Sequence, residues 1–151
     1  MHLDYFVRFA RAGLISFSLL SVACGDGEDN TGAKCQPGEA AEIEIAGDWV
    51  SNFGGTERID SETWGDLTVI EFDNCDNVAI TQNADDAEFS PGAYNRIVWT
   101  EPQADSFYYC WVDFRLDSAD DARASTATAD ASAPEIDGCG GSNPWTKLSA
   151  Q

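Results

Sequence analysis

Short runs of alternating apolar and polar residues recur between residues 42 and 151, and turn residues separate them. This spacing is typical of antiparallel β-structure. Gly54 and Gly55 predict a hairpin, because glycine adopts the positive φ angles of tight primed turns. We expect six or seven strands in a mainly β fold, a small antiparallel meander closed as a barrel or a half-closed sandwich. The predicted strands cover about residues 43–50, 56–63, 67–72, 78–81, 96–100, 107–114 and 145–148.

One Ala-rich helix is predicted before the last strand, over about residues 118–130. Ser118 is a suitable N-cap, and Asp120 and Asp121 favour the positive end of a helix dipole. Pro134 sets the limit at the other end. The apolar stripe of this helix is made of small side chains, which bury little area, so we expect weak docking without further support. The stripe consists of Ala119, Ala122, Thr126 and Ala129.

The predicted strand at residues 107–114 is apolar on both faces. In a one-sided sheet only one of these faces would meet a core. The Ala-rich helix is one cover for the second face, since such helices pack on sheets. A ligand pocket or a carbohydrate-binding surface is the other, because the mouths of β-barrels are common ligand sites. The candidate ligand-binding residues are therefore aromatic: Trp99, Tyr109 and Trp111.

The first 23 residues have a different pattern, with Arg8 and Arg11 ahead of an uncharged, mostly apolar run at residues 12–23. A run of this length is shorter than the about 20 residues that a transmembrane helix needs, and it is typical of a signal peptide. We therefore predict that residues 1–23 are a signal peptide and that the protein is exported. Residues 21–23 also fit the small-residue cleavage site of an ordinary secretory signal.

Residues 20–25, Leu-Ser-Val-Ala-Cys-Gly, resemble the lipobox of bacterial lipoproteins. The resemblance implies that Cys24 is lipidated and becomes the first mature residue, which gives the protein a membrane partner. The chain has 5 cysteines, and an odd number in an exported protein leaves one thiol over. Lipid attachment at Cys24 would leave four cysteines that can all pair. Residues 24–41 then form a flexible, acidic tether, and residues 42–151 form a single β-rich domain.

The net charge and the histidine content argue against several classes of function. The chain has 8 Lys and Arg against 27 Asp and Glu, a formal net charge of −19, which would repel nucleic acid. Its one histidine, His2, falls in the predicted signal peptide, so we predict no histidine-dependent catalytic or zinc site in the mature domain. Neither residues 73–77 nor residues 113–121 match an EF-hand calcium loop. We predict no catalytic residues, cofactor or metal; a carboxylate-dependent hydrolase remains the enzymatic alternative.

Four cysteines beyond Cys24 allow three disulfide connectivities. Cys110 precedes the predicted helix and Cys139 follows it, so a bridge between them would hold the helix on the sheet from both sides. Cys35 and Cys75 would then join the end of the tether to a turn. Each bridge would contribute roughly 3–4 kcal/mol in the chain-entropy picture.

Residues 46–148 resemble a set of small, mostly uncharacterised exported bacterial lipoproteins. The resemblance implies export and a shared fold, and it supports the Cys110–Cys139 pairing because the family pattern features both cysteines. The sequence Gly47-Asp48-Trp49 is similar to the G-x-W of lipocalin-type barrels, which points to a barrel. The motifs that carry the main resemblance are W-x-x-N-F-G-G-T at 49–56, A-I-T-Q-N at 79–83, W-T at 99–100, Y-Y-C at 108–110, G-C-G-G at 138–141 and W-T-K-L at 145–148.

The sequence thus predicts a lipid-anchored protein of the bacterial cell envelope, at the outer membrane and facing either the periplasm or the cell surface. Its disulfide-linked, non-catalytic β domain would act in binding or in a structural role. The alternative is a barrel that binds a small ligand or a glycan through tryptophan and tyrosine. A glycan, lipid or protein would then be the partner.

Overall fold

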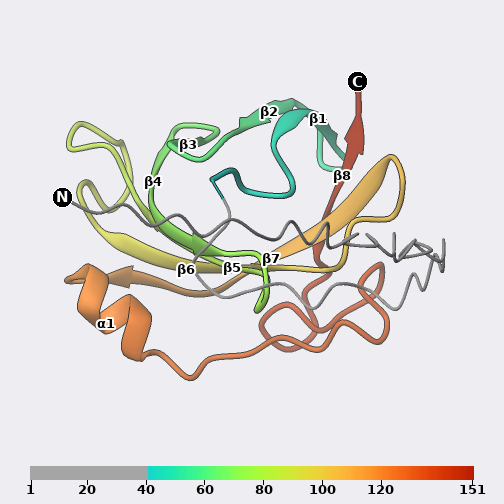
Figure 1. The fold of residues 1–151 in the computed structure, drawn as a ribbon. Coiled ribbons are helices and arrows are strands. Elements are labelled where there is room, and N and C mark those ends of the chain that lie inside the picture. The colour runs from blue at the N-terminus through green and yellow to red at the C-terminus, as the bar shows by residue number, and fades with distance from the viewer. Residues whose placement is uncertain (1–40) are drawn as a thin grey trace, which may run out of the picture. The chain divides into compact units, whose positions relative to one another are not determined.

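A computed structural model of the protein describes residues 41–151. The described chain is mainly β, and its strands form one closed barrel in which each strand pairs with its neighbours in the sequence (Figure 1). All pairings are antiparallel, including the pairing of the first strand with the last that closes the barrel. The predicted mainly β fold is confirmed, with the barrel in place of the half-closed sandwich. The predicted signal peptide, Cys24, Cys35 and the tether before Ala41 lie outside the described residues.

The strands are more numerous than predicted because the expected strand at residues 56–63 is divided in two. The Asp60 carboxylate accepts hydrogen bonds from the backbone N–H groups of Glu62 and Thr63, at 2.9 and 2.8 Å, and so bends the chain into a turn. The strands are β1 (Gly47–Ser51), β2 (Thr56–Ile59), β3 (Thr63–Trp64), β4 (Leu67–Asp73), β5 (Val78–Gln82), β6 (Tyr94–Trp99), β7 (Ser106–Leu116) and β8 (Thr146–Ala150).

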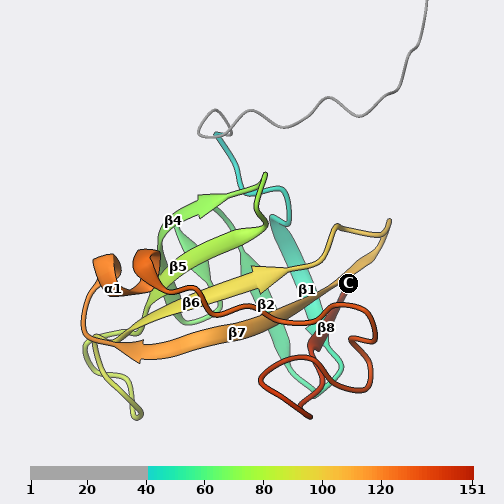
Figure 2. The ribbon, with the colours of Figure 1, turned by 90° about the horizontal axis from the view of Figure 1, so that it is seen from below.

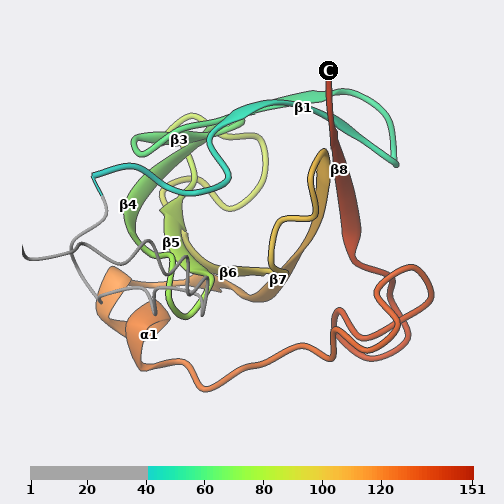
Figure 3. The ribbon, with the colours of Figure 1, turned by 45° about the vertical axis from the view of Figure 1, so that its right-hand side comes forward.

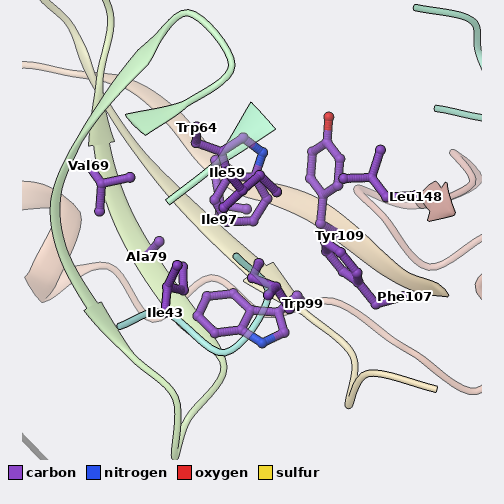
Figure 4. Close-up of a cluster of buried hydrophobic side chains, with 11 residues drawn as sticks. Ile43, Ile59, Trp64, Val69, Ala79, Ile97, Trp99, Phe107, Tyr109 and Leu148 are labelled. Carbon is purple, nitrogen blue, oxygen red and sulfur yellow. The ribbon is translucent and has the colours of Figure 1, made fainter. Parts of the chain in front are cut away.

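The barrel interior is filled by large apolar side chains from nearly every strand. Inward-facing positions alternate along β6 and β7, as the apolar pattern of the sequence requires. Each fully buried Leu, Ile or Phe contributes about 1.5–3 kcal/mol relative to an exposed one. The buried cluster, much of it drawn in Figure 4, consists of Ile43, Ile45, Ile59, Trp64, Val69, Ala79, Ile97, Trp99, Phe107, Tyr109 and Leu148.

The first strand is shorter than predicted. It begins at Gly47, and Ile43 and Ile45 lie before it in a turn where the Ala46 N–H donates to the Ile43 carbonyl at 3.1 Å. Both isoleucines are nevertheless only 1% exposed. Their alternation with glutamates therefore arises because one side of the segment is buried, although the segment is not a strand.

The helix α1 (Ala119–Ala124) is also shorter than the predicted range of 118–130. Its start agrees with the sequence, since the Ser118 hydroxyl accepts a 3.1 Å hydrogen bond from the Asp121 N–H. Its end is set by Ser125, which leaves the helical conformation and donates a 2.6 Å hydrogen bond to the Asp113 carboxylate. Ser and Thr hydroxyls compete with helix formation through such hydrogen bonds, and residues 125–128 are Ser-Thr-Ala-Thr.

The outer face of β5, β6 and β7 is covered by α1 and by the segment that follows it. The helix packs against all three strands (Figure 2). Ala122 on the helix is fully buried. Residues 125–145 then run outside the barrel to β8 (Figure 3). Tyr108 donates a 2.6 Å hydrogen bond from the outer face of β7 to Glu135 in this segment. Much of the second apolar face of β7 is thus covered by the protein itself.

A disulfide joins Cys110 on β7 to Cys139 in the covering segment, with 5.5 Å between the two Cα atoms. This is the pairing that the resemblance favoured. Cys75 is also disulfide-bonded. The predicted pairing of Cys75 with Cys35 falls on a residue outside the described range.

Candidate functional site

The two ends of the barrel are built differently. At the end that holds the β2–β3 and β4–β5 turns, residues 41–46 lie across the opening, and we call this segment the plug. The Ile43 N–H donates to the Ser61 hydroxyl at 3.1 Å, and the Asn74 side chain accepts from the Glu44 N–H at 3.1 Å. The Asn74 amide also donates to the Glu42 carbonyl at 3.0 Å. Hydrogen bonds and buried isoleucines together close this end.

Trp99, a predicted ligand-binding residue, belongs to the closed end. Its indole N–H donates a 2.7 Å hydrogen bond to the Glu44 carboxylate of the plug. The side chain is only 4% exposed and lies near Ile43 (Figure 4). Trp99 therefore packs the core under the plug rather than lining an opening.

The opposite end of the barrel contains a cavity of about 650 Å³, which we call the mouth cavity. It lies between the β3–β4 turn, the β5–β6 loop and the last residues of β7. Leu67 and Trp111 supply apolar walls, and Phe89 and Phe114 stand at the rim with 73% and 50% of their surface exposed. Exposed aromatic side chains around an opening are unusual for a surface that contacts only water.

The floor of the mouth cavity is polar and ordered. Asn95 is 1% exposed, and its amide donates to the Asn83 side-chain oxygen at 2.8 Å. The Asn95 oxygen accepts a 3.4 Å hydrogen bond from the Arg115 N–H. Arg115 has a φ angle of 61°, in the left-handed region, where β7 departs from regular pairing with β6. The irregularity turns the end of β7 so that backbone and side chains meet at this floor.

A smaller cavity of about 330 Å³ shares Leu67, Trp111 and Asp66 with the mouth cavity and extends toward β2. Its most unusual wall is the Glu57 carboxylate, which lies half-buried on the inner face of β2. One Glu57 oxygen accepts a 2.9 Å hydrogen bond from the Tyr109 hydroxyl, and the other accepts from the Trp64 indole N–H at 3.2 Å. The predicted residues Tyr109 and Trp111 both line this smaller cavity, and Trp111 also lines the mouth cavity beside it.

The Tyr109 phenol is held in its neutral form. Burial raises the pKa of Tyr109 first, and the negative charge and hydrogen bond of Glu57 raise it further. Hydrogen bonds with Thr146 and Trp111 act in the opposite direction and are smaller. Tyr109 is therefore a hydrogen-bond donor in this cavity at any ordinary pH.

Sequence reasoning missed Glu57 and Asn95. Both occupy inward-facing positions of strands, two residues before the buried Ile59 and Ile97. The available signal was a polar residue at a position where the alternation of the strand predicts an inward-facing side chain. A polar group buried there needs a hydrogen-bond partner, because burial without one is costly. Their partners come from distant strands, which alternation alone does not reveal.

Among residues 41–151, no group of three or more His, Cys, Asp or Glu side chains is arranged to hold a metal ion. No helix of the described chain has the length and apolar character needed to span a membrane.

Comparison of the sequence with family models and with curated proteins, and of the fold with solved structures, finds no match.

Proposed function

We propose that the barrel binds a small, partly apolar organic molecule in the mouth cavity. The single observation that carries this proposal is the difference between the barrel's ends: one is closed by the plug, and the other opens into about 650 Å³ lined by aromatic side chains. Small-molecule sites are typically concave, about 300–1,000 Å³ in volume and mostly apolar, with a few fixed polar groups. The mouth cavity has this size and this composition.

The polar groups on the floor of the mouth cavity are suited to ligand binding. Asn83 and Asn95 form its floor and are held by the hydrogen bond between them. Amide side chains donate and accept hydrogen bonds but do not exchange protons at ordinary pH. They are suited to orient a ligand, while Trp111 and Leu67 bury its apolar part.

We also propose that the protein does this at the bacterial cell envelope, anchored by lipid on Cys24. The support is the sequence: a basic residue pair, an apolar run at residues 12–23 and a lipobox-like ending. A Cys24→Ala variant should leave the membrane fraction and appear in the soluble fraction. Retention of this variant in the membrane fraction would contradict the anchor.

Binding can be tested with a neutral fluorescent probe, N-phenyl-1-naphthylamine, titrated into the full chain. We expect saturable enhancement of its fluorescence. Ala84→Trp should weaken it strongly, because Ala84 lines the mouth cavity and a large side chain there would occupy part of the cavity. Ala131→Trp is the matched control, since Ala131 is exposed in the segment outside the barrel. Equal binding by both variants, or no binding by the unaltered protein, would refute the proposal and favour a structural role.

A further inference from the structure

Glu57 places a carboxylate inside the barrel without a cationic partner. Among residues 41–151, no Lys or Arg forms an ion pair with it. Its neighbour Arg58 points to the outside and pairs with Asp48 at 3.3 Å and Asp60 at 3.7 Å. The hydrogen-bond donors to Glu57 are neutral, the Tyr109 hydroxyl and the Trp64 indole. A carboxylate that is partly withdrawn from water is stabilised by a nearby positive charge, and here a ligand could supply that charge.

Aromatic rings surround the same position. Trp64, Tyr109 and Trp111 line the smaller cavity together with Glu57. The Trp64 and Tyr109 rings lie with centroids 5.2 Å apart at 67° to each other, so they form two differently oriented walls. Ring faces attract cations through their quadrupoles, and groups of rings are a recurrent way to bind substituted ammonium ions. A carboxylate among such rings adds direct charge attraction.

The mouth cavity also favours a positively charged ligand. Asp66, Asp86 and Glu88 line the mouth cavity, against one cation, Arg115. The Arg115 guanidinium lies 5.4 Å from the centroid of the exposed Phe114 ring, so an aromatic side chain at the rim already holds a positive charge. The net charge of −19 for the whole chain also raises the local concentration of cations near the surface.

We propose that the ligand is an organic cation of the substituted ammonium type, with its charged head beside Glu57 and its apolar part in the mouth cavity. The inference rests on the proposed small-molecule binding and names the chemical class that the site takes. The hydrogen bonds from Tyr109 and Trp64 orient the carboxylate, and its remaining lone pairs are available to the ligand. An anionic ligand would meet Glu57 and the acidic rim and bind poorly.

The test compares choline with 3,3-dimethyl-1-butanol, which has the same shape with carbon in place of the charged nitrogen. Both are titrated into the full chain, with binding followed by tryptophan fluorescence and calorimetry. We expect choline to bind at least about tenfold more tightly, as charge and ring contacts together require. Glu57→Gln should remove the preference while keeping a hydrogen-bond acceptor. Glu62→Gln, which removes an exposed charge at the closed end, should leave it unchanged.

The outcomes separate this inference from the proposed function. Equal affinities for the two probes in the unaltered protein, no binding of either, or a choline preference that survives Glu57→Gln would overturn the cation inference. The comparison in the unaltered protein does not depend on how well the variant folds. If N-phenyl-1-naphthylamine still binds and Ala84→Trp still weakens its binding, the proposed function stands while the ligand class is wrong. If the dye also fails to bind, both are wrong.

Discussion

The Tyr109 hydroxyl on β7 donates a 2.9 Å hydrogen bond to Glu57 on β2, across an interior that separates two strands with no direct pairing. Below this contact the barrel is packed with apolar side chains up to the plug. Beyond it lie the smaller cavity and the mouth cavity. The pair therefore marks the boundary between the part of the barrel that supports the fold and the part that we propose binds a ligand.

Tyr109 should give the protein a distinctive alkaline response. Burial and Glu57 raise the pKa of Tyr109 above its ordinary value of about 10. The folded protein therefore keeps a proton that the unfolded chain loses at high pH. This contribution to stability is full below about pH 10 and is lost as the pH rises further. Urea unfolding from about pH 8.5 to pH 11 should show a free energy of unfolding that falls above about pH 10.

Tyr109→Phe tests the origin of that response. The variant should lose about 1–2 kcal/mol of stability at neutral pH, since a hydrogen bond to a charged group is removed. Above about pH 10 its stability should fall less steeply than that of the unaltered protein. Tyr94→Phe is the matched control and should keep the steep fall. Identical alkaline profiles for the Tyr109→Phe variant and the unaltered protein would show that Tyr109 is not held neutral by the fold.

The plug should be part of the folded domain rather than an appendage. Ile43 is 1% exposed against the core, so Ile43→Ala should lower the free energy of unfolding by about 2–5 kcal/mol. Ile70→Ala makes the same chemical change on the outside of β4, where the side chain is 38% exposed, and should cost less than about 1 kcal/mol. Urea unfolding of the two variants provides the comparison. Similar losses would mean that the plug does not close the barrel.

The strands could be predicted from sequence because their signals are local. Alternation and turn residues located most of them within a few residues, and Ser118 located the start of α1. The end of α1 could not be read in the same way, because it depends on a hydrogen bond from Ser125 to Asp113 on a neighbouring strand. Ile43 and Ile45 alternated as a strand does, but their burial comes from the plug.

Only part of the candidate site could be predicted, because the remaining information is again not local in the sequence. Alternation assigns a strand residue to the inner or outer face of a sheet, and it placed Trp99, Tyr109 and Trp111 among the candidates. It does not say how far along the barrel axis a residue lies. Trp99 is at the closed end and Trp111 at the open one, a difference fixed by strand register. Glu57 was missed because its partner Tyr109 is 52 residues away.

Gly138 should be intolerant of any side chain. Its φ angle is +96°, and a Cβ atom there would collide with the Asp130 carbonyl. That carbonyl is fixed by the Trp145 indole N–H, which donates to it at 3.0 Å. Gly138→Ala should therefore cost about 3 kcal/mol or more.

Gly141 provides the matched control for this substitution. Its φ angle is +85°, and a Cβ atom would meet nothing within 4 Å. Gly141→Ala should cost only about 1 kcal/mol, the strain of the left-handed backbone itself. Thermal unfolding of both variants should separate the two effects. Equal losses would mean that the segment around Gly138 is not packed against Asp130.

The Cys110–Cys139 disulfide closes a loop across a sequence separation of 29 residues. The double variant Cys110→Ala, Cys139→Ala should lose roughly 3–4 kcal/mol, because the unfolded chain regains the freedom of that loop. Replacing only these two cysteines leaves the disulfide of Cys75 intact, whereas chemical reduction would break that bond as well. The free energy of unfolding in urea measures this loss. An unchanged value would show that the disulfide does not stabilise the covering segment.

The indole N–H signals in a heteronuclear NMR spectrum test most directly the claim that the open end of the barrel is the binding site. Titration of N-phenyl-1-naphthylamine should shift most the signal of Trp111, which lines the mouth cavity, and to a smaller extent that of Trp64, which lines the adjoining smaller cavity with Trp111. The signals of Trp49, Trp99 and Trp145 should stay in place, because their N–H groups are bonded to Ile45, Glu44 and Asp130 away from both cavities. Shifts confined to those three, or no shifts during saturable binding, would contradict the account.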